Sequence, residues 1–271
     1  MVMKAGRFLF LFFIIVAAGS VAGVSSSTRQ EVGGTAPASP SGPILAWGVL
    51  LGSAAPDEGR AVAVDGSGNV YVAGTSDAAW GKPVRAYGGG RDAFVAKLAP
   101  GGTLLWLTFL GGAGADAAAG IAMDGSGNVL VAGTSDASWG TPLRPIGSIP
   151  GNANAFAAKL GPGGVLLWNT FVGIGEYDRA AAIAVDASSN VLIAGHASFG
   201  GAFIEAFAAK LGPGGAFQWL TFLGGYGRDY GEAIAVDGSG NVHVAGTSDA
   251  AWGTPRRPFG GSSEAFAAKL G

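Results

Sequence analysis

The chain contains no cysteine, little charge and only two histidines, and each shortage excludes a class of structure or function. Without cysteine, neither a disulfide framework nor a cysteine-linked lipid anchor can form. Charged residues make up 13% of the 271 residues, and Lys and Arg do not gather into the basic patch typical of nucleic-acid binding. His196 and His243 belong to no G-x-S-x-G or H-E-x-x-H motif. We therefore expect no nucleic-acid partner and find no catalytic motif.

Glycine, in contrast, is abundant, with 50 residues beside 13 prolines. Such a proportion approaches that of disordered chains. However, 49% of the residues are hydrophobic, and the glycines recur at fixed places in a repeated pattern. The composition therefore indicates a folded repeat protein with many tight turns.

The N-terminus predicts export. A basic start, an apolar run over residues 8–18 and a small-residue stretch form a secretory signal peptide, residues 1–22, with cleavage after Ala22. An uncleaved membrane anchor is the alternative, because the apolar stretch to Val24 could cross a thin bilayer. Residues 23–42 are rich in Ser, Pro and Gly and predict a flexible linker, which leaves residues 43–271 as the folded part. We expect a secreted, periplasmic or cell-surface protein that contacts a membrane only if the signal segment is retained.

A repeated phrase dominates the remaining sequence. "VDGSGNVYVAGTSDAAWG" begins at Val64 and returns from Met123 and Val236, and a more divergent copy begins at Val185. Each unit holds four short runs of strand-forming residues bounded by Gly, Pro, Asp and Asn. In the first unit these are Ala61–Val64, Val70–Gly74, Ala93–Leu98 and Leu104–Leu110. We name the runs strands a, b, c and d, with "DGSGN" as the hairpin turn from a to b.

Units of four antiparallel strands are typical of the blades of a β-propeller. The folded sequence begins with a d-type run, Ile44–Gly52, and finishes after a c-type run, Ala265–Leu270. These two runs together would complete a fourth blade. We therefore predict an all-β, four-bladed β-propeller, closed as a monomeric ring by pairing the N-terminal strand with the last blade. An eight-bladed ring of two chains and an open array with fewer blades are the alternatives.

The repeat also resembles a known family. "DGSGNVYVAGTS" followed by "YGGGRDAFVAKLAPGGTLLWLTFLGG" is similar to the bacterial SBBP-type β-propeller repeat, and the similarity runs from about Ile44 to Gly271. The resemblance implies a propeller and an exported or cell-surface protein, and it implies no particular activity. The third repeat departs from the pattern, because its b–c loop is short and its turn reads "DASSN".

One aspartate recurs in every d–a loop, eight residues before the aspartate that ends strand a. Because strand a is normally innermost in a propeller, these carboxylates could surround one mouth of the central channel and bind Ca²⁺ or Mg²⁺. Alternatively, each caps its own loop by accepting backbone N–H groups. The four candidate metal ligands are Asp57, Asp116, Asp178 and Asp229.

The b–c loops lie on the same face as the d–a loops and carry aromatic residues. Tryptophans on one face of an exported propeller could stack on sugar rings, or each could fill the gap between its loop and the blade. The candidate ligand-binding residues are Trp80, Trp139, Phe199 and Trp252.

These features favour an exported, non-catalytic binding or scaffold module for a glycan or a partner protein. A metal-assisted hydrolase or lyase, with its site at the channel mouth, is the alternative. A purely structural surface-layer or adhesive component is the third interpretation.

Overall fold

The computed structural model describes residues 45–147, 152–200 and 203–271. The expected signal peptide and linker lie outside the described residues. One compact unit spans Leu51–Gly271, and a separate unit ends at Leu50. The described residues of the compact unit form antiparallel sheets, so the all-β class is confirmed. No helix long and apolar enough to cross a membrane is found among the described residues.

The first two sheets have four strands each, paired in chain order. The first sheet contains β1 (Asp57–Val64), β2 (Val70–Ser76), β3 (Asp92–Leu98) and β4 (Leu104–Leu110). The second contains β5 (Asp116–Met123), β6 (Val129–Ser135), β7 (Asn154–Leu160) and β8 (Leu166–Phe171). The strands a to d predicted for the first repeat are thereby confirmed, and strand a begins four residues earlier than expected.

The last two sheets repeat the order but differ in strand number. The third contains β9 (Tyr177–Val185), β10 (Val191–Phe199), β11 (Phe203–Leu211) and β12 (Phe217–Leu223). The fourth contains only β13 (Asp229–Val236), β14 (Val242–Ser248) and β15 (Glu264–Leu270).

The predicted a–b hairpin turns are confirmed. In the second sheet, Asp124 Oδ1 accepts hydrogen bonds from the backbone N–H groups of Ser126 (2.9 Å) and Asn128 (3.0 Å). Gly127 between them has φ +77°, a conformation that favours glycine. The pairing of β5 with β6 thus begins beside a turn that the side chain of Asp124 stabilises. The same Asp position makes equivalent bonds in the other three sheets, at Asp65, Asp186 and Asp237.

Each first strand contains a β-bulge, and a glycine of the second strand lies against it. In the second sheet the register shifts between Ala118 and Gly120, opposite Gly133. A Cβ on Gly133 would collide with the carbonyl oxygen of Ala117. The bulge brings the two backbones too close together for any side chain. The other three sheets keep the same glycine, at Gly74, Gly195 and Gly246, each facing a carbonyl oxygen of the first strand.

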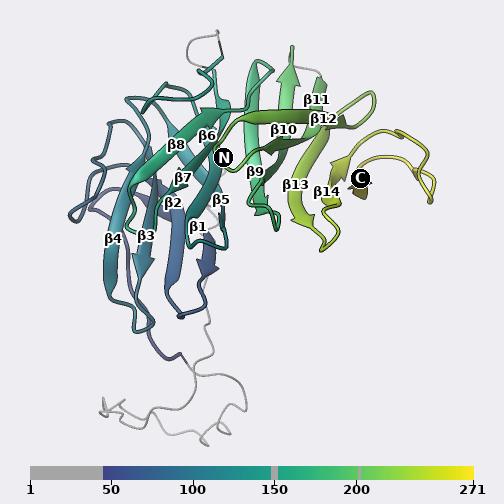
Figure 1. The fold of residues 1–271 in the computed structure, drawn as a ribbon. Coiled ribbons are helices and arrows are strands. Elements are labelled where there is room, and N and C mark those ends of the chain that lie inside the picture. Colours follow the sequence, from purple (N-terminus) through teal and green to yellow (C-terminus); the bar gives the residue numbers. More distant parts are fainter. Residues whose placement is uncertain (1–44, 148–151, 201–202) are drawn as a thin grey trace, which may run out of the picture. The chain divides into compact units, whose positions relative to one another are not determined.

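Successive sheets pack against one another through the first strand of the later sheet. β5 contacts the first sheet, β9 the second and β13 the third, and Figure 1 shows the sheets following one another in chain order. The hydrophobic core lies between them. Tyr71, Leu130 and Leu192 share one repeat position, and each is at most 1% exposed. Burying this apolar area between sheets is the main source of stability.

The predicted closure into a four-bladed ring is wrong. Residues 45–56 contain no strand, and β15 pairs with β14 alone among the described strands. Within residues 51–271, the inter-sheet contacts join consecutive sheets, and no substantial contact joins the first sheet to the last. A strand persists only where a neighbour supplies its backbone hydrogen bonds. The described sheets therefore form an open series, and the expected central channel, which depended on closure, is not formed by them.

Candidate ligand-binding site

The loop tryptophans pack onto the sheets that carry them. Trp139 lies edge-to-face on Phe156 of β7, with 5.2 Å between ring centroids, and is only 4% exposed. Trp80 packs on Phe94 at 5.5 Å in the same way. Such pairs add to the stability gained by burying the rings. This packing is the alternative that the sequence left open for these residues. Trp252 repeats it on Phe266 at 5.2 Å.

The third sheet differs, because its short loop offers Phe199 and no tryptophan. It ends β10 and packs edge-to-face on Phe222 of β12, with centroids 5.7 Å apart, while 38% of it stays exposed. Beside it lies a hollow of ≈ 370 Å³ at the junction of the second and third sheets. Its lining residues are Gly147, Asn152, Asn154, Gly173, Ile174, Gly175, Glu176, Phe199 and Gly200.

The hollow combines apolar and polar groups. Ile174 and Phe199 supply exposed apolar surface. Glu176 is exposed, and its backbone N–H donates to the carbonyl oxygen of Ser198 (2.8 Å), which fixes the d–a loop against β10. Asn154 is 3% exposed and donates from Nδ2 to the carbonyl oxygen of Asn152 (2.9 Å). An aromatic face beside carboxylate and amide groups can bind a polyhydroxylated molecule.

The four candidate metal ligands lie at or near the starts of their first strands. Each accepts a hydrogen bond from a backbone N–H four or three residues earlier in its own loop. The donors and distances are Ser53 to Asp57 (2.7 Å), Gly112 to Asp116 (2.9 Å), Gly175 to Asp178 (2.9 Å) and Gly225 to Asp229 (3.0 Å). In the described part of the chain, no three or more His, Cys, Asp or Glu side chains gather into a metal-binding group. Cation binding at these carboxylates stays a prediction.

The residue at or near the start of each third strand is a further polar position, which was not identified as a candidate from the sequence. It lies beside these aspartates. Asp92 at the start of β3 and Asp116 at the start of β5 are both 0% exposed. An oxygen of each lies 2.6 Å from the point where Gly111 would carry a Cβ. The signal was present in the strings "DAFVAKL", "NAFAAKL" and "EAFAAKL", whose first letter is always Asp, Asn or Glu.

The environment of this pair favours protonation. Burial raises the pKa of Asp92 to about 6, against the lowering effects of the Gly88 N–H and of Arg85. Burial likewise raises the pKa of Asp116 to about 6, and the neighbouring charge of Asp92 contributes to the increase. Oδ1 of each carboxyl is buried without a hydrogen-bond partner among the described residues. The arrangement can therefore hold a proton at mildly acidic pH.

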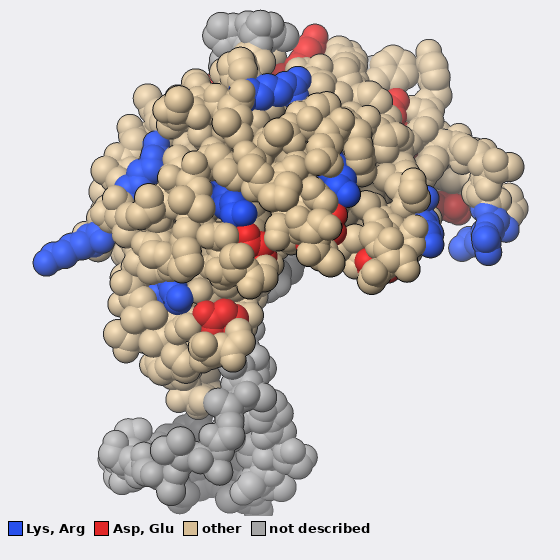
Figure 2. Space-filling view, viewed as in Figure 1, with Lys and Arg blue, Asp and Glu red and all other residues tan. Residues whose placement is uncertain are grey.

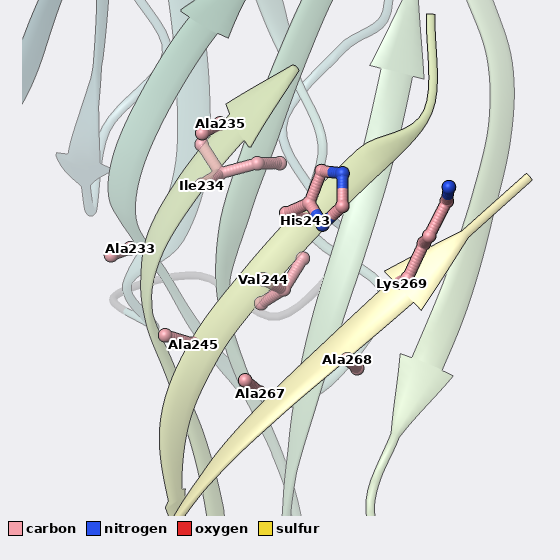
Figure 3. Close-up of a pocket in the computed structure, with 9 residues that line it drawn as sticks. All are labelled: Ala233, Ile234, Ala235, His243, Val244, Ala245, Ala267, Ala268 and Lys269. Carbon is pink, nitrogen blue, oxygen red and sulfur yellow. The ribbon is translucent and has the colours of Figure 1, made fainter. Parts of the chain in front are cut away.

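A second hollow, also of ≈ 370 Å³, lies on the last sheet. Figure 3 shows its side chains on β13, β14 and β15, most of them alanines, with His243 and Lys269 at one end. His243 Nε2 lies 3.2 Å from Asp237 Oδ2. His243 and Ala245 are exposed, whereas the equivalent Tyr71 and Ala73 are buried by the following sheet. This hollow is therefore a sheet face that no other described sheet covers.

Repeated four-stranded sheets stacked in series define a propeller-like repeat protein. Residues 46–79, 105–138 and 218–251 match the family model of the SBBP β-propeller repeat. These three matches confirm, over those segments, the resemblance found in the sequence. The divergent copy that begins at Val185 lies outside the matched segments.

Two further comparisons add little. No curated protein matches the chain. A crystal structure of a protein of unknown function from Bacteroides caccae is similar over 74% of this chain, with a TM-score of 0.43 and 16% sequence identity. The chain covers 56% of that protein's length.

Proposed function

We propose that the chain is an exported, propeller-like binding module that takes a glycan in the hollow beside Phe199. The observation that carries the proposal is the break in the repeat at this place. The other three loops pack a tryptophan onto the sheet. The third sheet instead leaves Phe199 partly exposed, beside Asn152 and Glu176.

The chemistry of the hollow suits a sugar. The exposed face of an aromatic ring can stack on the C–H groups of a sugar ring, while Glu176 and Asn152 can hydrogen-bond to hydroxyl groups. In the view of Figure 2, charged side chains of both signs are dispersed over a mostly uncharged surface. Such a surface favours an uncharged ligand over a polyanion. The signal-peptide pattern of residues 1–22 supports a location where extracellular glycans are met.

An oligosaccharide array followed by calorimetry tests the proposal. We expect the wild-type protein to bind at least one neutral oligosaccharide, and Phe199→Ala to weaken that binding at least about tenfold, because stacking and buried apolar area are lost. Glu176→Gln should weaken it further in the double variant.

Tyr226→Ala is the matched control. Tyr226 is 85% exposed and lies outside the residues that line the hollow, so its removal should leave the affinity unchanged. Equal losses in the Phe199 and Tyr226 variants, or an array without any bound oligosaccharide, would contradict the proposed function.

A further inference from the structure

In the described part of the chain, the last sheet has neither a fourth strand nor a covering sheet. β3, β7 and β11 each have a strand on both sides, whereas β15 has only β14 among the described strands. The face that carries His243, Ala245 and Ala267 is exposed, and Figure 3 shows these side chains on the surface of the three strands. An unpaired edge beside an uncovered apolar face is a surface that another strand can occupy.

The chain itself contains a segment with the sequence of the missing strand. Residues 46–52 read "AWGVLLG", and because the SBBP matches start at residues 46, 105 and 218, this segment corresponds to nearly the whole of β4 and β12. They form no strand, and Val49 and Leu50 are 43% and 100% exposed. This is an apolar d-type segment without a partner strand among the described residues.

The complete sheets show which strand follows a d-type strand and where that following strand packs. In the first sheet, the chain passes from β4 through a short loop directly into β5, which covers that same sheet. The corresponding loop after residue 52 has the same cap, because Asp57 accepts the N–H of Ser53 (2.7 Å), and it leads into β1. A segment paired with β15 would therefore bring β1 over the last sheet.

Among the described residues of one molecule this arrangement is not formed, because β1 makes no substantial contact with β13, β14 or β15. The surface that β1 would offer is nevertheless present. Val62 and Val64 of β1 are 45% and 51% exposed. Their counterparts in the second sheet, Ile121 and Met123, pack against the first sheet's core.

We propose that the last sheet binds a second copy of this chain, whose residues 46–52 add to β15 as the fourth strand. The contact joins the end of one molecule to the start of the next, so it is heterologous. The proposed contact has the same arrangement as the three sheet-to-sheet junctions within each molecule, in which the first strand of one sheet packs on the preceding sheet. The second copy's Val62 and Val64 then cover the alanine-lined face of the last sheet.

The register follows from the complete sheets. In the first sheet, Thr108 of β4 lies opposite Val95 of β3. The same register places Val49 of one copy opposite Ala267 of the other. Directly opposed residues in antiparallel strands have Cβ atoms about 5 Å apart, close enough for an engineered disulfide. The absence of native cysteine leaves no background reaction.

Cysteine cross-linking under oxidised glutathione tests the proposal on the full chain. A mixture of the single variants Val49→Cys and Ala267→Cys should give a disulfide-linked heterodimer. The double variant should link between molecules and not within one. Val49→Cys mixed with Ala268→Cys is the matched control; Ala268 is one residue out of register and on the opposite face, so it should link at least about tenfold less.

Three outcomes would overturn the proposal: an intramolecular disulfide in the double variant, equal linking in both registers, or no linking even at the highest concentration tested, with the unmodified protein also monomeric there. None of them bears on glycan binding beside Phe199, which lies on the third sheet. The two proposals therefore fail or stand separately.

Discussion

At the scale of single residues, the most unusual feature is a pair of buried carboxyl groups between the first and second sheets. Asp92 and Asp116 both lie next to Gly111. Beside them, Arg85 donates to the carbonyl oxygens of Phe109 (2.8 Å) and Gly111 (2.9 Å). Their raised pKa values mean that folding takes up protons at mildly acidic pH. The pair therefore stabilises the fold when it is protonated and destabilises it when both groups are charged.

The sign of the resulting pH dependence can be stated. In the unfolded chain an Asp has a pKa of about 3.9, and in the fold both groups have a pKa of about 6. Their contribution to stability is complete below pH ~4 and is lost as the pH rises through ~6. Asp92→Asn should flatten this slope and raise the free energy of unfolding at pH 7.5 by about 2 kcal/mol. Denaturant unfolding between pH 4.5 and 7.5 measures it.

The chain supplies its own control for this prediction. At the next junction the corresponding pair is Asn154 and Asp178, both next to Gly173. Asn154→Asp should therefore introduce a new loss of stability between pH 4.5 and 7.5. If Asp92→Asn and wild type lose stability in parallel over that range, the buried pair is not the source of the pH dependence.

At the scale of strands and turns, the repeated glycine of the second strand is the position least able to change. A Cβ on Gly133 would meet the carbonyl oxygen of Ala117 at the bulge of β5. Gly133→Ala must separate the two strands or remove the bulge. We expect it to lower the free energy of unfolding by about 3 kcal/mol.

Gly125→Ala is the comparison, because nothing lies within 4 Å of a Cβ at that turn position. Its effect on the free energy of unfolding should stay within about 0.5 kcal/mol. Chemical denaturation of both variants measures the difference. Similar costs at the two positions would mean that the bulge does not constrain the second strand.

The strands and turns could largely be predicted from the sequence, whereas their long-range partners could not. "DGSGN" between two apolar runs predicts a hairpin because the turn is local. The glycine in "VAG" is itself a signal of a bulge or a close backbone approach. The segment around Trp47 has the pattern of a strand as well, yet it forms none. Whether such a segment forms a strand depends on whether the fold brings a free strand edge next to it. The local sequence pattern does not contain that information.

The site was predictable only in part, for a related reason. The loop aromatics were recognised as a repeated feature, but a tryptophan pattern is the same whether the ring binds a ligand or packs on a strand. Only the structure separates the nearly buried Trp139 from the partly exposed Phe199. The hollow beside Phe199 arises where the repeat is broken, at the short loop that the sequence did mark as different.

At the scale of the whole compact unit, sheets of repeated sequence stack one on the next without closing. Each junction between sheets buries apolar side chains, so the inner sheets are covered on both faces. In such repeat proteins the total stability is approximately the sum of the stabilities of the repeats and of the interfaces between them. Among the described residues, the last sheet has a free edge and a free face. Local opening should therefore be easiest at β15.

Amide hydrogen exchange, followed by mass spectrometry at low protein concentration, tests this open series most directly. The β15 amides that do not bond to β14 should exchange much faster than the equivalent amides of β3, β7 and β11, and should become protected as the concentration rises and second copies bind. Equal protection of β15 and these three inner strands at the lowest concentration would contradict the account, because a fourth strand would then already be paired within one molecule.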